Sequence, residues 1–297
     1  MPRRNLSDGT EYFYTDRGSG PPVVLAHGWG TCGLVWEDQV AALVAHHRVI
    51  VPDWRGCGRS DHPAHGNTIR RIAEDFLELY QQLELQKAVW VGSSIGGNIV
   101  LDLATRNPDT AAGVVLIDAP LHWFADGLNP VTFATWTASL RRDRPKIFTD
   151  MVRGWFGPTV GADTRRWTVD MLLRSGWFID DTLKNANTHD LRATLPHLQV
   201  PVLFLHGRHD GEVPLHVPEE AARLLPHAQL RVHETAGHMP HLEVPAEVNR
   251  AIAGFISEIR SREQRWGDEP LRIPGSSRSN QREVTALCQC CGGRGSP

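Results

Sequence analysis

The chain has 297 residues, of which 41% are hydrophobic and 22% are charged, and its formal net charge at pH 7 is −3. This length allows one large hydrophobic core or two small ones, and the composition is ordinary for a globular protein. No block of like charge indicates nucleic-acid binding, and no apolar run approaches the roughly 20 residues that span a bilayer.

Short apolar runs alternate with amphipathic stretches over the first 120 residues. A strand is predicted at 11–16, where aromatic residues alternate with polar ones. Four further runs are typical of strands that are buried on both faces of a parallel sheet. These runs cover residues 23–26, 48–51, 88–91 and 114–117.

Two helices are predicted between these strands. Apolar residues recur at three- and four-residue steps over 69–83, with Asn67 or Thr68 as the N-cap. A second helix is predicted over 94–106. Buried strands that alternate with helices of this kind indicate an α/β fold with a doubly wound, mostly parallel sheet.

The pattern changes after Asp118. Residues 121–190 contain no short apolar strands and are rich in tryptophan, so we predict a helical cap inserted into the core. The core itself is predicted to comprise residues 1–120 and 191–262. In its second part, strands are expected at 202–205 and 229–233, and helices at 217–225 and 248–259.

The segment 263–297 is polar and aperiodic, and we predict that it is disordered. Three cysteines lie in it, at Cys288, Cys290 and Cys291, but without the second ligand pair that a metal site needs. The chain has five cysteines with no regular spacing, which fits a reducing compartment. Because the polar start also lacks a signal-peptide pattern, we expect a cytoplasmic protein.

A Gly-x-Ser-x-Gly stretch directly follows the predicted strand at 88–91. Between a buried strand and a helix, this pattern is the nucleophile elbow, in which Ser94 stands at the tip of a strained turn. Gly92 and Gly96 leave room where strand and helix pack closely together. The turn exposes the Ser94 hydroxyl and directs the helix N-terminus towards a bound group, so we predict a nucleophilic serine.

A serine nucleophile needs a base, and the base needs an orienting acid. Asp210 follows the predicted strand at 202–205, and His238 follows the next strand along the chain. The carboxyl ends of these strands are expected at one edge of the sheet, so the aspartate and histidine are predicted to act with Ser94. The 28 residues from position 210 to position 238 leave room for one helix and one strand.

The loop after the strand at 23–26 supplies the remaining part of the predicted site. The backbone amides of Trp29 and Ile95 are expected to converge on a developing oxyanion. His27 is expected to order this loop by hydrogen bonding. His241 and Glu243 are expected to belong to the supporting loop of the predicted histidine rather than to the chemistry.

Over residues 10–260 the chain resembles proteins of the α/β-hydrolase fold. Serine esterases, lactonases and cofactor-free haloperoxidases are the branches that it resembles most. Three motifs besides the elbow carry the resemblance, namely D-x-x-G-x-G-x-S at 53–60, Gly-x-x-Asp at 207–210 and Gly-His-x-Pro at 237–240. The resemblance implies a triad of Ser94, Asp210 and His238, with the Trp29 and Ile95 amides as oxyanion donors.

Some positions depart from the patterns of particular branches. Gly30 stands where perhydrolase-type members carry proline, which disfavours perhydrolysis. The serine nucleophile, in place of an aspartate, argues against dehalogenase and epoxide hydrolase chemistry. Ser93 stands where many relatives carry histidine or asparagine.

A second resemblance points to a different reaction. Gly28, Trp29 and the stretch 49–56 also resemble cofactor-independent ring-cleaving dioxygenases built on this fold. Those enzymes use a His–Asp pair whose acid follows the sixth strand, the place that Asp118 occupies. However, Thr31 stands where that group has a histidine, and the usual hydrolase acid is also present.

The favoured interpretation is a serine hydrolase that cleaves a carboxylic ester, lactone or related acyl compound with an apolar portion. The alternatives are the dioxygenase and a non-catalytic ligand receptor on the same fold. A small-molecule substrate is expected, with no metal, organic cofactor, nucleic acid or membrane partner, and the oligomeric state stays open. The candidate substrate contacts are His27, Asp118, Trp123, Trp155 and Trp177.

Overall fold

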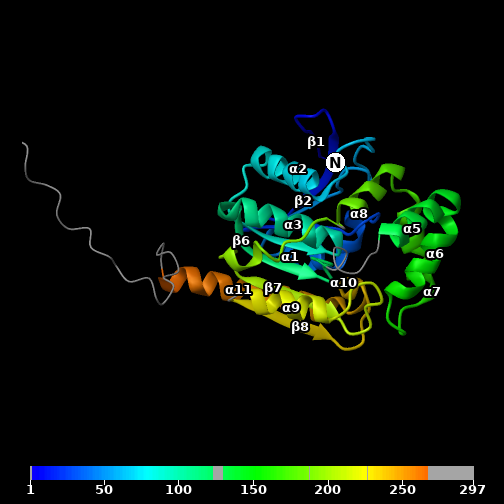
Figure 1. Cartoon of the computed structure of the whole chain (residues 1–297). Coiled ribbons are helices and arrows are strands. Elements are labelled where there is room, and N and C mark those ends of the chain that lie inside the picture. Colours follow the sequence, from blue (N-terminus) through cyan, green and yellow to red (C-terminus); the bar gives the residue numbers. More distant parts are fainter. Residues whose placement is uncertain (1, 123–129, 187, 226, 267–297) are drawn as a thin grey trace, which may run out of the picture.

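The computed structural model describes residues 2–122, 130–186, 188–225 and 227–266. Within these ranges the centre of the molecule is an eight-stranded sheet with the order β1-β2-β4-β3-β5-β6-β7-β8 (Figure 1). The strands are β1 Arg3–Asn5, β2 Glu11–Arg17, β3 Pro22–Ala26, β4 Arg48–Pro52, β5 Ala88–Ser93, β6 Ala111–Ile117, β7 Val202–Gly207 and β8 Ala228–His233.

The strands from β4 to β8 run parallel, whereas β2 is antiparallel to β4 and β1 is antiparallel to β2. Every residue of β3, β5 and β7 is buried, because helices cover both faces of the sheet. The predicted doubly wound, mostly parallel sheet is therefore confirmed. The sequence pattern does not predict β1, whose three residues are all exposed and pair with β2 through the backbone and through an ion pair between Arg3 and Glu11.

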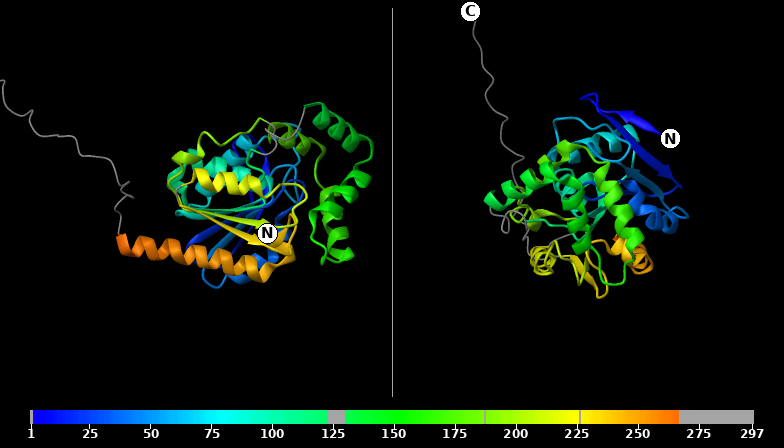
Figure 2. Two further views of the ribbon diagram at one scale, coloured as in Figure 1. Left: turned by 60° about the horizontal axis from the view of Figure 1, so that its bottom comes forward. Right: turned by 90° about the vertical axis from the view of Figure 1, so that its right-hand side faces the viewer.

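The helices that cover the sheet are α1 Glu37–Leu43, α2 Ile69–Gln82, α3 Ile95–Arg106, α9 His216–Leu224, α10 Pro240–Glu243 and α11 Pro245–Trp266. Helices α2 and α3 pack together on one face, and α1 and α11 pack together on the other (Figure 2). The N-cap of α2 is Thr68, whose hydroxyl accepts a hydrogen bond from the Arg71 amide at 3.2 Å. Of the two predicted caps, the structure thus selects the second.

Between β6 and β7, the described residues form the helices α5 Pro130–Arg142, α6 Arg144–Trp155, α7 Ala162–Leu173 and α8 Asp180–Ala186. Figures 1 and 2 show α5, α6 and α7 together beside the end of the sheet towards which the parallel strands point. These helices fall within 121–190, where the sequence predicts a helical cap. The division into core and cap stays a prediction.

Helix α11 continues to Trp266, past the predicted core boundary at 262. Residues 261–266 contain no glycine or proline to end the helix, which explains the longer element. The rest of the predicted tail, 267–297, lies outside the described residues. Among the described residues, short 3-10 helices lie at η1 Gly33–Trp36, η2 Pro108–Thr110, η3 Trp177–Ile179 and η4 Leu195–His197.

None of the helices in the described ranges combines the length and apolar character that crossing a membrane requires.

Candidate active site

Ser94 lies in the sharp turn between β5 and α3, with φ of 52° and ψ of −126°, a strained conformation for a residue other than glycine. Two glycines allow this turn. A Cβ on Gly92 would lie 2.3 Å from the Gly96 oxygen, and a Cβ on Gly96 would lie 2.4 Å from the Ala26 oxygen. The Ser94 amide donates to the Ile117 oxygen at 2.8 Å, which ties the turn to β6.

The loop after β3 passes directly against this serine. A Cβ on Gly28 would lie 3.3 Å from the Ser94 Cβ and 4.0 Å from its Oγ, so the glycine keeps this side of the hydroxyl open. Trp29 is the next residue of that loop. Ile95 is the first residue of α3, where the amide has no partner within the helix. Both amides therefore belong to backbone segments that adjoin the serine.

His27 is fully buried and orders the same loop. Its Nδ1 donates to the Gly28 oxygen at 2.9 Å, its Nε2 accepts from the Trp54 amide at 3.2 Å, and the two rings stack with centroids 5.2 Å apart. Burial lowers the pKa of His27 to about 4, so the ring is neutral. Both ring nitrogens are engaged in holding the loop, which is the role that the sequence predicts.

Asp210 follows β7 and His238 follows β8, the neighbouring strand of the sheet. The His238 Nδ1 donates to the Asp210 Oδ2 at 2.8 Å. The other oxygen of Asp210 accepts hydrogen bonds from the amides of Glu212 at 2.8 Å and Val213 at 3.0 Å. The structure thus brings the predicted acid and base together at the edge of the sheet where Ser94 follows β5.

Charge stabilises this pair against the cost of burial. Burial favours the neutral carboxyl, but the charge of His238 and its hydrogen bond outweigh that effect and lower the pKa of Asp210. Burial likewise favours the neutral imidazole, but the Asp210 carboxylate raises the pKa of His238 above 6.5. A carboxylate at Nδ1 that stabilises the imidazolium suits the histidine to accept a proton at Nε2.

A second carboxylate holds the loop of this histidine. Glu243 Oε1 accepts from the amides of Gly237 at 3.0 Å and Met239 at 3.1 Å, the residues on either side of the base. Its Oε2 accepts from the amide of Gly157, between α6 and α7, at 2.7 Å. The amide of the histidine donates to the oxygen of Trp155, the last residue of α6. The supporting role predicted for Glu243 is confirmed, and it includes helices α6 and α7.

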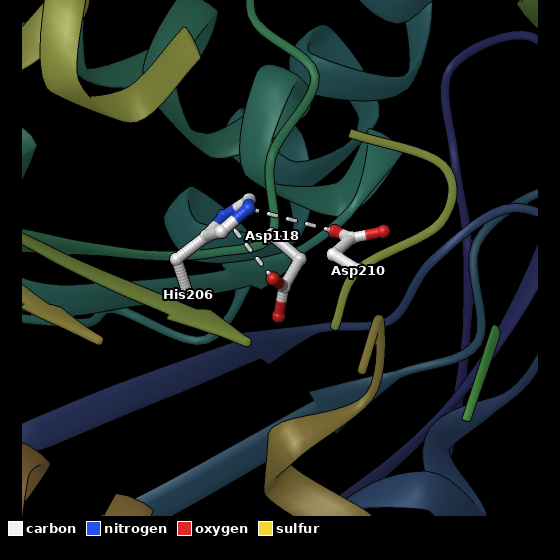
Figure 3. A group of neighbouring side chains, drawn as sticks. All are labelled: Asp118, His206 and Asp210. Carbon is white, nitrogen blue, oxygen red and sulfur yellow. Dashed lines mark ion pairs between the residues drawn. The ribbon is translucent and has the colours of Figure 1, made fainter. Parts of the chain in front are cut away.

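Asp118, at the end of β6, pairs with a histidine that the sequence motifs do not single out (Figure 3). Its Oδ1 accepts from the Gly207 amide at 2.9 Å and lies 3.1 Å from the His206 Nδ1. The other ring nitrogen lies 3.0 Å from the Val213 oxygen. Donor atoms of the aspartate, this histidine and Asp210 lie within 4.8 Å of one another, as in a metal site, but all three side chains already bond to protein groups.

The alpha/beta hydrolase family matches residues 23–251 of the chain. The chain belongs to this family. Non-heme chloroperoxidase from Streptomyces lividans is 32% identical over 271 residues, which cover 84% of this chain and 97% of the relative. Pimeloyl-(acyl-carrier protein) methyl ester esterase from Vibrio vulnificus is 29% identical over 261 residues, which cover 84% of this chain and 99% of the relative.

Solved structures of alpha/beta hydrolases share the fold. An esterase from Exiguobacterium antarcticum has a TM-score of 0.82 and 26% identity, covering 86% of this chain and 98% of its own. An enol-lactonase from Burkholderia xenovorans has a TM-score of 0.76 and 26% identity, covering 86% of this chain and 100% of its own. The family and fold that the motifs predict are confirmed, and these relatives support hydrolysis as the activity.

Three tryptophans of this alpha/beta hydrolase are candidate substrate contacts. Trp155 is buried, and its ring centroid lies 5.7 Å from that of the predicted base, His238. Trp177 is 57% exposed, with the Arg144 guanidinium 4.9 Å from its ring centroid. Trp123 lies outside the described residues. Of the three, Trp155 has a described contact with the predicted base.

An aromatic cluster joins the loop after β3, which carries Trp29, to α5 and α6. The Trp29 ring centroid lies 5.8 Å from that of Trp136 and 5.7 Å from that of Phe148. The Trp29 indole also donates to the Ile179 oxygen at 3.0 Å. The density of tryptophans in 121–190 is the only sequence pattern that points to this cluster, since no motif pairs such distant residues.

Proposed function

We propose that this alpha/beta hydrolase is a serine hydrolase that cleaves a carboxylic ester, lactone or related acyl compound through an acyl-enzyme. The observation that carries the proposal is the 2.8 Å bond from the His238 Nδ1 to the Asp210 Oδ2, at the edge of the sheet that bears the strained Ser94. An aspartate at Nδ1 sets the imidazole tautomer, so that Nε2 is free to accept the proton of a serine hydroxyl.

In the first half of the reaction, His238 removes the Ser94 proton as the serine oxygen attacks the substrate carbonyl carbon. The new C–O bond converts the carbonyl to a tetrahedral oxyanion. The amides of Trp29 and Ile95 are the proposed donors to this oxygen. As the tetrahedral species collapses, the imidazolium returns its proton to the leaving alcohol, and the acyl group stays on the serine.

In the second half, water replaces the alcohol. His238 takes a proton from the water as its oxygen attacks the acyl carbon, and the proton then returns to Ser94 when the carboxylic acid leaves. Asp210 stays ionised throughout, which agrees with the lowering of its pKa by His238 and the neighbouring amides. No step of this scheme requires a metal or an organic cofactor.

An apolar acyl or alcohol portion is the proposed substrate feature. The ring of Trp155 beside the predicted base, and the cluster of Trp29, Trp136 and Phe148 beside the oxyanion loop, support it. Aromatic side chains contribute large apolar contact areas with little loss of conformational freedom. Esterase and lactonase relatives agree with a substrate of this class.

A panel of chromogenic esters of increasing acyl length, run beside an oxygen electrode, tests the proposal. Ester turnover that Ser94→Ala lowers by about 10⁴- to 10⁶-fold is expected, together with fluorophosphonate labelling that the variant loses. Ser93→Ala, which alters the adjacent buried serine, is the matched control and should keep both. Oxygen uptake with a heteroaromatic substrate that survives Ser94→Ala would instead establish the dioxygenase. Ligand-induced thermal stabilisation without turnover would establish a receptor.

A further inference from the structure

Two buried polar side chains take no part in the proposed reaction. The side chain of Asp118 is 0% exposed and that of His206 is 1% exposed. They lie beside Asp210, whose Oδ2 is 3.8 Å from the His206 Nε2, and their facing atoms, Asp118 Oδ1 and His206 Nδ1, are 3.1 Å apart (Figure 3). A buried charge is costly unless it is compensated, so the net charge of this pair affects the electrostatic environment of the neighbouring Asp210.

The contacts determine how many protons the pair holds. The His206 Nε2 faces the Val213 carbonyl oxygen at 3.0 Å, and since a carbonyl only accepts, Nε2 carries a hydrogen. One proton then lies between the His206 Nδ1 and the Asp118 Oδ1. Without a proton there, the lone pairs of the two atoms would face and repel each other, and with two protons the two hydrogens would collide. Whether that proton resides on oxygen or on nitrogen, the pair has no net charge.

The electrostatic surroundings agree with this proton count. Burial, followed by the negative charge of Asp210, raises the pKa of Asp118 well above its usual range. Burial lowers the pKa of His206. Both directions favour a protonated carboxyl that donates to a neutral imidazole.

The pair also holds the backbone that positions the predicted acid. The Val213 oxygen accepts from the His206 Nε2, while the amide of the same residue donates to the Asp210 Oδ1 at 3.0 Å. Asp118 Oδ1 accepts from the Gly207 amide at 2.9 Å, at the end of β7 from which the acid's loop departs. Both ends of that loop therefore depend on the pair.

We infer that Asp118 and His206 form a neutral, proton-sharing pair that positions Asp210 through Val213 and Gly207 without adding a second charge beside it. The importance of this pair for turnover rests on the proposed function, whereas its protonation does not. Asp118 and His206 are positioning residues, since the described contacts place neither of them against the reacting groups.

Two variants of His206 test the positioning. In His206→Gln the side-chain amide can still donate to the Val213 oxygen, whereas His206→Leu removes that donor. We expect the leucine variant to lower kcat by about 10- to 100-fold with KM changed by less than about threefold, and the glutamine variant to stay within about fivefold of the unaltered chain. Equal losses in both variants, or no loss in either, would overturn the positioning role.

Nuclear magnetic resonance of the full chain, labelled with nitrogen-15, tests the protonation without any substrate. A protonated Nε2 is expected for His206. Asp118→Asn removes no net charge from a neutral pair, so it should leave the titration midpoint of the His238 ring unchanged. The carboxylates of Asp210, Glu212 and Glu243 also act on this ring, and the pKa values of His206 and His241 respond to its charge; the substitution alters none of these side chains.

A fall in that midpoint in Asp118→Asn would show that Asp118 is ionised beside a neutral His206, and would overturn the neutral pair. The low-field proton of the bond from the His238 Nδ1 to Asp210 provides a second readout of position. It should persist in His206→Gln and weaken in His206→Leu even if no ester is cleaved. A failure of the inference can thus be told apart from a failure of the proposed function.

Discussion

Glu243→Gln tests how far the loop of the predicted base depends on the neighbouring helices. The carboxylate accepts three amide hydrogen bonds, from Gly237 and Met239 at one oxygen and from Gly157 at the other. A glutamine has one carbonyl oxygen and one NH₂ group. Its oxygen can still accept from the Gly237 and Met239 amides, but its NH₂ group then faces the Gly157 amide, and two donors cannot bond to each other. The substitution therefore removes the bond to Gly157, between α6 and α7, while it spares the backbone around the base and the bond from the His238 amide to the Trp155 oxygen.

The expected loss follows from these three bonds. A hydrogen bond to a charged group contributes about 1.5–3 kcal/mol, and Glu243 is only partly buried, which favours the lower end. Glu243→Gln should lower the free energy of unfolding by about 2 kcal/mol, and Glu243→Ala, which loses all three bonds, by about 4 kcal/mol. Turnover should separate the variants further. It should stay within about fivefold in the glutamine variant and fall by about 10- to 100-fold in the alanine variant, since the base is then misplaced.

Urea unfolding, with equal slopes required of all variants, measures the stability, and kcat on one ester measures the turnover. Glu258→Gln is the control, because its exposed carboxylate on α11 contacts only the Gln229 side chain among the described hydrogen bonds, and the change should cost less than about 0.5 kcal/mol. Two results would refute the reasoning. One is equal loss of turnover in Glu243→Gln and Glu243→Ala, and the other is a Glu243→Gln variant as stable as the control.

Three further predictions concern the acid, the base and a helix cap. Asp210→Asn should lower kcat by about 10³- to 10⁴-fold and Asp118→Asn by less than about tenfold. Both are measured on one ester at a saturating concentration, and circular dichroism confirms that both variants fold. If Asp118→Asn lowers kcat more than Asp210→Asn does, Asp118 is the acid. Because the pKa of His238 is raised, kcat/KM should rise with pH along a limb centred above 6.5, and Asp210→Asn should move that limb to lower pH. The same shift stabilises the fold below pH 6.5, and this contribution should disappear as pH rises through the raised pKa, measured by urea unfolding across that range. Thr68→Ala should lower the free energy of unfolding by about 1 kcal/mol, because it removes the N-cap hydrogen bond of α2. An unchanged midpoint of urea unfolding would show that this cap does not stabilise the fold.

The strands of the sheet are predictable because their burial leaves a pattern in the sequence. Runs such as 88–91 and 202–205 are apolar throughout, since both faces of β5 and β7 are covered. Strand β1 and helix α1 leave no such pattern. The first is a short exposed edge strand with no buried residue, and the second is one short amphipathic stretch of seven residues.

Which of two aspartates pairs with the predicted base, His238, depends on the order of the strands in the sheet, and the spacing of residues in the sequence does not give that order. Asp118 and Asp210 both follow buried strands and both point to the same edge of the sheet. In the sheet, β7 lies between β6 and β8. Because neighbouring strands are about 4.8 Å apart, the acid after β7 is one strand from His238 and the acid after β6 is two strands away. The nearer acid makes the 2.8 Å bond, and the farther one meets His206 instead.

Backbone strain gathers at this same edge of the sheet. Among the described residues other than glycine, positive φ occurs at Glu84 and at three positions that follow β5 or β6, namely Ser94, Asp118 and Leu121. Each such residue costs on the order of 1–3 kcal/mol and persists only where its surroundings hold it. The hydrogen bonds at these three positions should therefore identify what fixes the geometry of the site.

Those bonds come from the core of the fold. The Ser94 amide donates to the Ile117 oxygen of β6 at 2.8 Å, and the Asp118 amide donates to the Leu205 oxygen of β7 at 3.0 Å. Each bond joins the residue after one strand to the next strand of the sheet. At Leu121, the side chain of Asn98 from α3 bonds to both the amide and the carbonyl. The strained residues are thus held by the sheet and by α3, so the position of the proposed nucleophile depends on how β5, β6 and β7 pack together.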